Sequence, residues 1–554
     1  MARKKRERIA VLDAETDPFK FNREPKPFAW GLMWDGFYKE FWGEDCTDQL
    51  LEFLQDESDL LIYIHNGGKF DVHFFIKHLD ENVKMIGPRI AECSLFGGRV
   101  KIRDSYCIIP LPLSAGDKGE IDYDIMESEK RYIPKNKKLI SEYLRQDCVA
   151  LLNWVNRFRE EFGNSLTLGG CTFKLLPSFD YEVQKTFDEK YDSQMRDFFY
   201  GGRVQAFKVG AFGPDAALKY YDIQSAYPFG MVHDHWYDYS FVTSSTLPEG
   251  ENGSWFAVIE GVSKGALPFR GKNKTYYPDD DVIRRYNACG WEINTALELG
   301  LLEITSVIKV FKPLFKKSLK TFIEHYYTKK LQAEIDGDRD TRTFAKLAMN
   351  VPYGKLAQDA RKFKDYRITE PGQRVEGGGW ELEEMTPHLW IHSRPSPQTT
   401  FFNVATSASI TSFVRAYLLK AIHSSENVLY CDTDSIICSK FGARVGKNLG
   451  DWDCEEPRVI EAYIACRKMY AIKSIKSFSW PSLLKRVPKT KTKTASKGVR
   501  LSFDEIKNGV KYGGQIEWRS IAPNFNIKRE VKFSERVIDF SDIEKNTCTT
   551  PDIL

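Results

Sequence analysis

Alternation of apolar and polar positions predicts that the chain opens with strands separated by turns. In residues 9–16 (IAVLDAET), alternate side chains share one face of a strand, which places Asp13 and Glu15 on the same side. Residues 61–64 (LIYI) predict a second buried strand, and the spacing in residues 72–79 predicts a helix after it. The first strand therefore ends in two acidic side chains on its buried face.

A second informative pattern lies at residues 430–435 (YCDTDS). Apolar runs at 427–430 and 436–438 flank a turn-like Asp-Thr-Asp sequence, which predicts a strand–turn–strand hairpin. The carboxylates of Asp432 and Asp434 would repel each other at this tip unless water solvates them or a divalent cation bridges them. Taken alone, the segment is either a solvated acidic turn or a metal site.

Between these patterns, a strand and a helix each carry a candidate charged group. Residues 218–222 predict a strand that ends in Asp222 and is followed by a turn. Residues 341–350 predict a helix with Asp340 as its N-cap. Lys346 lies on this helix with other basic residues near its face, which is either solvated or in contact with a triphosphate.

Composition limits the class of protein. The 554 residues predict about three to five domains or subdomains. With 80 Lys and Arg against 77 Asp and Glu, the net charge is only +3, so any surface for a polyanion must be local. Eleven cysteines without metal-ligand spacing predict a reducing, cytoplasmic compartment, and the lack of a long apolar run argues against a membrane segment or export signal. Each local basic cluster is either a solvated face or a phosphate contact; the clusters are residues 3–8, 135–138, 309–320 and 485–497.

Four acids in the first 150 residues suit a phosphodiester hydrolase that uses two metal ions. Asp13 and Glu15 end a strand, and Asp71 begins a helix, where it either caps the helix or binds metal. Asp147 lies one helical turn after Tyr143, so both share a face and the tyrosine could orient the attacking water.

These segments resemble the three exonuclease motifs of DnaQ-like 3′–5′ proofreading domains. The motifs are D-x-E at Asp13, N-x(2-3)-F/Y-D ending at Asp71, and Y-x3-D ending at Asp147. The resemblance implies an RNase H-like fold, in which all four acids bind metal ions and hydrolysis runs from the 3′ end. It also implies that Asn66 and Phe70 lie near a single-stranded 3′ end.

Three later segments resemble motifs A, B and C of the family B DNA polymerases: residues 222–228 (DIQSAYP), 346–354 (KLAMNVPYG) and 430–435. The resemblance implies a palm domain that binds two Mg²⁺ ions, or Mn²⁺, for nucleotidyl transfer. The implied metal ligands are Asp222, Ile223 and Asp432, with Asp434 in a supporting role. The implied nucleotide ligands are Ile223, Tyr227, Lys346, Asn350 and Tyr353, and Tyr227 would reject a 2′-hydroxyl.

Motif B departs from the family pattern, because Val351 and Pro352 follow Asn350 where a serine is usual. The hydroxyl group is lost and the helix must end early. Further short segments resemble motifs of the protein-primed phage branch, in which synthesis starts on a terminal protein. The resemblance implies that Lys118 assists exonucleolysis and that DNA or terminal protein contacts Ser105, Phe199, Gly201, Gly202, Thr411, Arg415, Lys468, Tyr470 and Lys497.

Some of these residues have ordinary structural alternatives. Arg415 and Lys468 could instead form surface salt bridges, which contribute about 0–1 kcal/mol. Lys493 and Lys497 lie in a polar, repetitive stretch that is either a DNA contact or a flexible loop.

The expected architecture is a multidomain α+β and α/β chain, with an RNase H-like exonuclease domain followed by a right-hand polymerase carrying terminal-protein-type insertions. The expected parts are the exonuclease domain (1–190), a linker (191–205), a palm segment with the first insertion (206–310), the fingers (311–355), a β-hairpin second insertion (356–400), a second palm segment (401–465), and the thumb with the C-terminal region (466–554).

The function expected from the resemblance is protein-primed replication of a linear phage-type genome in the host cytoplasm, with proofreading and strand displacement. Its partners would be template and primer DNA, dNTPs, a terminal protein and a single-stranded DNA-binding protein. The enzyme would be a monomer or a heterodimer with terminal protein, away from membranes. Two alternatives remain open: a family B polymerase that uses nucleic-acid primers, and a nuclease or DNA-binding protein whose polymerase half has decayed.

Overall fold

The computed structural model describes most of the chain. The described residues are 7–19, 24–115, 119–183, 187–272, 274–385, 388–396, 402–475, 489–496, 498–520, 524–526, 529–532 and 534–541. Two predicted site residues, Lys118 and Lys497, lie outside these ranges. Within them, no helix is both long and apolar enough to cross a bilayer.

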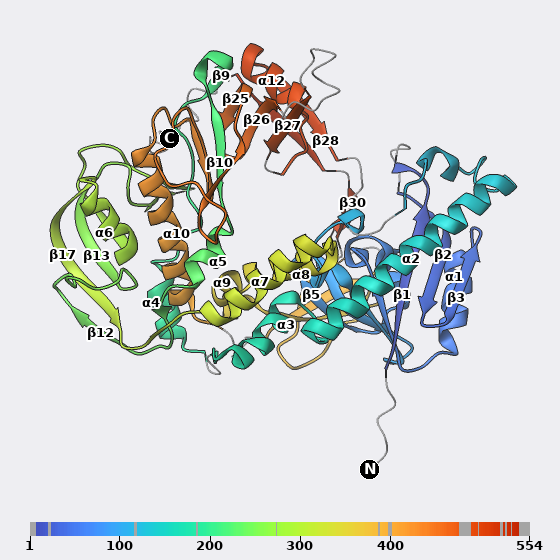
Figure 1. Cartoon of the computed structure of the whole chain (residues 1–554). Coiled ribbons are helices and arrows are strands. Elements are labelled where there is room, and N and C mark those ends of the chain that lie inside the picture. The colour runs from blue at the N-terminus through green and yellow to red at the C-terminus, as the bar shows by residue number, and fades with distance from the viewer. Residues whose placement is uncertain are drawn as a thin grey trace.

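The N-terminal part is built on a ten-stranded sheet, whose strands β1 to β7 are drawn in blue on the right of Figure 1. Its central strands β1, β4 and β7 run parallel, as expected for a sheet that helices cover. In spatial order the strands are β20 (Glu381–Met385), β21 (Trp390–Pro395), β19 (Lys364–Thr369), β5 (Asn82–Ile86), β6 (Arg89–Leu95), β7 (Val100–Asp104), β4 (Leu60–Ile64), β1 (Arg8–Thr16), β2 (Pro27–Trp34) and β3 (Phe37–Trp42).

The predicted alternation in β1 separates its two faces. Val11 belongs to the core that includes Leu144 of α2 (Pro134–Phe162), whereas Leu12 belongs to the core that includes Leu50 of α1 (Cys46–Gln55). Asp13 and Glu15 continue the face of Val11, as the strand period requires. The acids at the end of β1 therefore lie on the side of the sheet that α2 covers.

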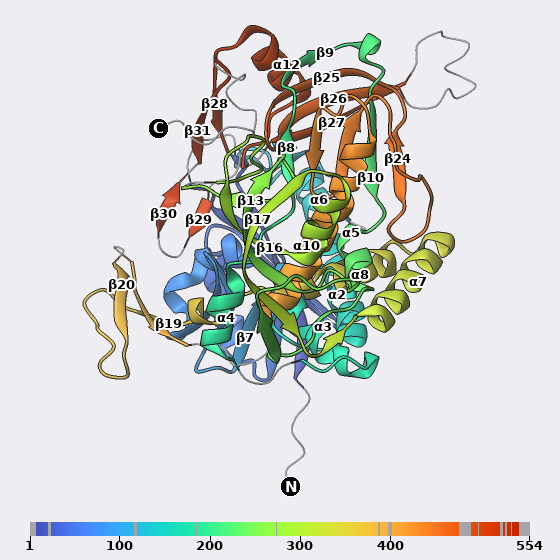
Figure 2. The same cartoon turned by 90° about the vertical axis from the view of Figure 1, so that its left-hand side faces the viewer.

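Strands from the expected second insertion complete this sheet. Strand β19 pairs with β5, with Tyr366 opposite Val83, and β21 and β20 follow outward. The segment projects from the body of the molecule at the lower left of Figure 2. An insertion more than 260 residues later in the chain is thus joined by backbone hydrogen bonds to the N-terminal sheet.

A five-stranded sheet with α10 (Val404–Ser424) forms the centre of the second half of the chain. Its strands in spatial order are β24 (Trp452–Glu456), β10 (Lys219–Ile223), β23 (Ser435–Cys438), β22 (Tyr430–Asp432) and β8 (Val204–Ala206). Strands β22 and β23 form the predicted hairpin. A four-stranded sheet with α6 (Gly290–Glu298) lies on the left in Figure 1, and a sheet with α12 (Phe503–Tyr512) lies at the top.

Two antiparallel helices, α7 (Lys320–Asp336) and α8 (Arg339–Asn350), project between these parts (Figure 1). The N-cap of α8 is Asp338, whose side chain accepts a hydrogen bond from the Thr341 N–H, so the cap expected at Asp340 lies two residues earlier in the chain. After Asn350 a new helix, α9 (Pro352–Leu356), begins with Pro352 in its first turn, where a missing N–H costs nothing. The proline in motif B therefore starts a helix as well as ending one.

His235 in β11 (His235–Trp236) makes the stability of this half of the chain depend on pH. Its two ring nitrogens bond the Ser409 hydroxyl and the Gly230 carbonyl, and burial lowers the pKa of His235 to about 4. The unfolded chain, with the ordinary value of 6.5, takes up the proton first as the pH falls. Stability from this group is complete above pH 6.5 and decreases toward pH 4, by up to about 3 kcal/mol.

We expect the melting temperature of the His235→Gln variant to fall less between pH 7.5 and 5 than that of the wild-type protein. His423→Gln, a change at an exposed histidine of α10, is the control and should keep the wild-type slope. Thermal unfolding followed at several pH values checks this. Equal slopes for His235→Gln and the wild type would contradict it.

Candidate active sites

The acids of the predicted motifs A and C meet on the central sheet. Strand β23 lies between β10 and β22, and Ser435 is the register partner of both Asp222 and Asp432. The N–H of Ile223 donates to the Asp434 carbonyl at 2.8 Å, which fixes the end of β10 against the hairpin turn. Acids more than 200 residues apart in the sequence therefore lie at the same end of this sheet.

Asp434, rather than Asp432, faces Asp222 across a pocket of about 550 Å³. Burial, then Asp434, raise the pKa of Asp222 to about 7. Burial, then Asp432, raise the pKa of Asp434 to about 6. Thr433 has a φ of +59°, and this left-handed turn residue breaks the strand alternation that would otherwise place both hairpin acids on one face.

Asp432 is held by other groups of the protein. Lys468 Nζ lies 2.5 Å from its Oδ1, and the Thr433 hydroxyl donates to the same oxygen at 3.1 Å. The Tyr430 hydroxyl accepts the Lys468 N–H at 2.9 Å. The expectation that Asp432 is the second metal ligand and Asp434 its support is therefore reversed by this arrangement, because the pocket is lined by Asp434 while Asp432 pairs with a lysine.

The donor groups at this pocket fit a divalent cation. A cation bound between Asp222 and Asp434 would relieve the repulsion by which Asp434 raises the pKa of Asp222, and carboxylate and carbonyl oxygens suit Mg²⁺ or Mn²⁺. The pocket is lined by Asp222, Ile223 and Asp434. Among the described residues, no group of three or more His, Cys, Asp or Glu side chains is placed to bind a metal ion, so a cation here would rely on two carboxylates and backbone or substrate oxygens.

The opposite wall of the pocket is basic and comes from α7 and α8. Lys346 and Asn350 line it as predicted, together with Arg342 and Lys330. Sequence reasoning missed Lys330, which is 8% exposed and forms no ion pair within the described part of the chain. Burial and the nearby Arg342 and Lys346 lower the pKa of Lys330, against the opposing effect of Glu334. Lys330, Arg342 and Lys346 thus line the same pocket as Asp222 and Asp434, and Arg342 pairs there with Glu334 at 2.6 Å.

Tyr227 lines this pocket and Tyr353 stacks on it. The rings of Tyr227 and Tyr353 are stacked, with centroids 3.9 Å apart and an angle of 13° between the planes. Asn350 turns its side chain back to the Lys346 carbonyl, at 2.8 Å. The residues of motifs A and B that were predicted to bind a nucleotide are therefore gathered at one place, in contact with one another.

The exonuclease acids gather at the end of β1. Burial and the carboxylates of Asp13, Asp147 and Glu15 raise the pKa of the Cys148 thiol well above its usual range, which places these three acids near one another. Burial, a hydrogen bond between the Tyr143 and Tyr123 hydroxyls, and the nearby Asp147 and Glu15 raise the pKa of Tyr143.

Asp71 lies in the first turn of the 3₁₀ helix η3 (Asp71–His78), where residue 70, without a side-chain cap, occupies the N-cap position. This segment follows β4, whose parallel pairing with β1 brings it to the same edge of the sheet. The oxygen donors suit Mg²⁺ or Mn²⁺. As at the first site, no group of three or more such side chains is placed for a metal ion among the described residues, so a cation here would also rely on backbone, water or substrate oxygens.

The predicted contacts to single-stranded DNA divide into two groups. Phe70 and Asn66 are partly or fully exposed, and Asn66 has a left-handed backbone (φ +61°) and accepts a hydrogen bond from Arg89 at 2.9 Å. Ser105 is completely buried, with its hydroxyl bonded to His65 at 2.9 Å and to the Ile64 carbonyl. The prediction that Ser105 contacts DNA is therefore contradicted by its burial.

The prediction of DNA contact is also contradicted for Thr411 and Arg415. Thr411 is 1% exposed and donates to the Ala408 carbonyl. Arg415 is 2% exposed and forms a buried ion pair with Glu292. Of the remaining predicted contacts, Lys468 and Gly201 are accessible and Gly202 and Phe199 partly so, whereas Tyr470 is buried against Tyr430.

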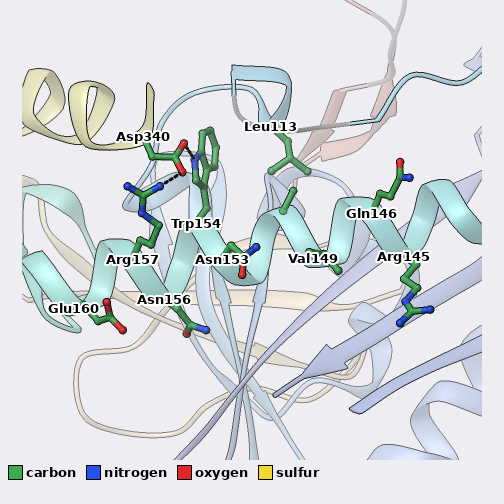
Figure 3. A pocket seen from close by; sticks show the side chains of 11 residues that line it. Leu113, Arg145, Gln146, Val149, Asn153, Trp154, Asn156, Arg157, Glu160 and Asp340 are labelled. Atoms are coloured by element: carbon green, nitrogen blue, oxygen red, sulfur yellow. Dashed lines mark hydrogen bonds and ion pairs between the residues drawn. The ribbon is translucent and has the colours of Figure 1, made fainter. Parts of the chain in front are cut away.

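A second pocket lies where α2 meets the first turn of α8 (Figure 3). Asp340 accepts hydrogen bonds from Trp154 Nε1 and from Arg157, both at 2.6 Å, and Arg157 also pairs with Asp338 at 2.7 Å. Below these contacts, Phe158 of α2 packs edge-on against Phe344 of α8. The α7–α8 pair is therefore anchored on the helix that carries Tyr143 and Asp147.

Taken together, the fold and the polymerase site define a template-directed nucleic-acid polymerase. The family model described as DNA polymerase type B, organellar and viral, matches residues 103–378. The DNA-directed DNA polymerase of Enterobacteria phage PRD1 is 37% identical over 567 residues, covering 97% of this chain and 99% of the phage protein. A probable DNA polymerase of Agaricus bitorquis is 22% identical, over 86% of this chain and 71% of that protein.

The chain therefore belongs to the viral type B DNA polymerases, and the family resemblance drawn from its motifs is confirmed. The structure of Phi29 DNA polymerase with primer-template DNA and incoming nucleotides covers 96% of this chain and is itself covered completely, with a TM-score of 0.70 at 16% identity. This match confirms the expected fold, an exonuclease-type domain followed by palm, fingers and thumb.

Proposed function

We propose that this DNA polymerase joins nucleotides at the pocket between Asp222, Asp434 and the basic face of α7 and α8. The observation that carries the proposal is Lys330, a buried cation without an ion pair in the described residues, which lines the same pocket as the two acids. A buried ammonium group needs an anionic partner, and a nucleoside triphosphate brings one.

The residues of the pocket have different roles in nucleotidyl transfer. Asp222, Asp434 and the carbonyl of Ile223 would hold Mg²⁺ or Mn²⁺, which supplies a lowered pKa for the primer hydroxyl and charge neutralisation at the α-phosphate. Lys330, Lys346 and the neighbouring Arg342 bind the triphosphate and stabilise the charge that develops on the departing pyrophosphate. Tyr227, which lines the same pocket, would reject a 2′-hydroxyl through its ring.

The same chain is proposed to remove mispaired 3′ ends. Asp13, Glu15, Asp71 and Asp147 would hold the cations for phosphodiester hydrolysis, and Tyr143 would orient the attacking water. Lys118, which lies outside the described residues, is assigned to the same step by its motif. The structure of the related phage enzyme with bound primer-template DNA and nucleotides supports DNA and dNTPs as the partners of this chain.

Initiation on a terminal protein is proposed from the phage relatives and the motifs of that branch. A heterodimer with terminal protein, strand displacement, a single-stranded DNA-binding protein and activity in the host cytoplasm follow from the same proposal. Lys468, which pairs with Asp432, would contact the primer strand, whether its hydroxyl comes from DNA or from protein.

Incubation of the full chain with candidate terminal protein, template, Mg²⁺ and labelled dNTP tests the mode of priming. We expect a labelled protein band that disappears without template or terminal protein. A DNA-primed template in a parallel reaction serves as the control for activity. Extension of the DNA primer without any labelled protein would favour an enzyme that uses nucleic-acid primers, and failure of both reactions would favour a decayed polymerase.

A further inference from the structure

Arg415 is bound on all sides by protein groups. Its Nε donates to Glu292 Oε1 at 2.8 Å and its Nη2 to Oε2 at 2.7 Å, a paired contact of the kind that a planar guanidinium makes. Its Nη1 donates to two successive backbone carbonyls, that of Tyr200 at 2.6 Å and that of Gly201 at 2.9 Å. With both side chains of the ion pair 2% exposed, the guanidinium has no surface left for DNA.

These contacts orient the backbone of the segment that joins the two halves of the chain. In a planar trans peptide the N–H points away from the carbonyl of the same unit. Because the carbonyls of Tyr200 and Gly201 point toward Arg415, the N–H groups of Gly201 and Gly202 point the opposite way. Gly201 is exposed, and neither N–H has an acceptor in the described part of the chain. Two successive free N–H groups suit a phosphate oxygen.

The oriented segment also touches the catalytic turn. The Thr433 N–H donates to the Arg203 carbonyl at 2.6 Å. A Cβ atom on Gly202 would lie 2.7 Å from the side chain of Thr433, so only glycine allows this approach. Thr433 stands between Asp432 and Asp434, and a phosphate bound at the two glycines would therefore lie at a fixed distance from the polymerase acids.

Glu292 brings a third part of the molecule into this arrangement. It lies on α6, where it accepts a further hydrogen bond from the Ser412 hydroxyl at 2.7 Å. The ion pair thus joins the insertion helix α6, the palm helix α10 and the linker. Removing one member alone would leave a buried charge unpaired, whereas removing both together avoids that penalty.

We infer that Arg415 is a positioning residue, which, paired with Glu292, turns the N–H groups of Gly201 and Gly202 toward a phosphate of the template strand. The inference rests on the proposed function, since it concerns the DNA that the polymerase site uses. It assigns the template contact to the linker backbone and gives Arg415 no direct contact with DNA.

The test compares three proteins: the wild type, a double variant that carries both Arg415→Met and Glu292→Met, and the single variant Arg415→Lys. Binding of primer-template DNA is measured at several salt concentrations. We expect the double variant to bind about tenfold more weakly at every salt concentration, the effect of losing a hydrogen-bonded phosphate contact. Backbone N–H groups neutralise no charge, so the slope of log affinity against log salt should stay at the wild-type value.

A direct contact between Arg415 and a phosphate predicts a different result. Loss of that cation would make the slope shallower by about 0.7 to 0.9, and Arg415→Lys would restore it, because lysine neutralises a phosphate equally well. Under the positioning role, Arg415→Lys binds more weakly than the wild type, since one ammonium group cannot hold Glu292 and both carbonyls. A shallower slope would overturn the inference.

Neutral methylphosphonate substitutions, placed one at a time along the template strand, locate the contact. We expect one position that weakens wild-type binding about tenfold and has little further effect in the double variant. The same sensitivity in both proteins would overturn the inference. Retained 3′ excision of single strands shows that the double variant is folded. If the double variant does not fold, Arg415→Lys is compared with the wild-type protein on the same methylphosphonate templates. Failure of the wild-type protein to extend a primer would instead contradict the proposed function.

Discussion

Asp222→Asn is expected to reduce primer extension at least about 1,000-fold, because the loss of a metal ligand removes several kcal/mol of transition-state stabilisation. The substitution keeps the size of the side chain, and the amide no longer carries the charge that a cation requires. Single-turnover incorporation of one dNTP on a primer-template, followed by rapid quenching, measures the effect.

Excision of a single-stranded 3′ end by Asp222→Asn should remain at the wild-type rate, because the acids at the end of β1 belong to a different sheet. Asp453→Asn is a matched control at the rim of the same pocket, where the aspartate pairs with Lys447 at 2.9 Å. It should extend primers within a few-fold of the wild type, as expected for an ion pair whose lysine is 80% exposed. Extension by Asp222→Asn at a comparable rate would remove Asp222 from the reaction.

The double variant Asp13→Ala with Glu15→Ala is expected to lose 3′ excision by at least about 1,000-fold, for the same reason at the second site. Both acids lie on the α2 side of β1, and extension of a paired primer should continue at the wild-type rate. A 5′-labelled single strand with Mg²⁺ measures excision, and the same label on a primer-template measures extension.

Glu24→Ala together with Asp35→Ala is the control for this double variant, because both acids are exposed and lie outside the exonuclease motifs. It should excise and extend like the wild-type protein. If Asp13→Ala with Glu15→Ala still shortened single strands, other residues would catalyse the hydrolysis. The resemblance to proofreading domains would then hold for the fold but not for these two acids as catalytic residues.

Local sequence patterns were sufficient for the elements that carry the acids. The alternation in residues 9–16 and the Asp-Thr-Asp break predicted β1 and the β22–β23 hairpin, because strand period and turn preference act over a few residues. The helical face shared by Tyr143 and Asp147 was also predicted, and both residues lie on α2. These features depend on neighbours in the chain.

Contacts between residues that are far apart in the chain could not be predicted from local sequence patterns. Two acids on either side of Thr433 look equivalent in sequence, and only the pairing of β10 with β23 decides which of them faces Asp222. Arg415 is buried because Glu292, 123 positions earlier, supplies its counter-charge. Lys330 gave no motif signal, since it becomes a pocket residue only when α7 packs beside α8.

The central claim is that polymerisation depends on Asp434 facing Asp222, while Asp432 acts through Lys468. The most direct test is the rate of single-nucleotide incorporation by Asp434→Asn and Asp432→Asn, measured side by side at saturating dNTP. We predict a loss of at least about 1,000-fold for Asp434→Asn and a loss of about 10- to 100-fold for Asp432→Asn, which removes a charged hydrogen-bond partner of Lys468. A larger loss for Asp432→Asn than for Asp434→Asn would contradict the claim.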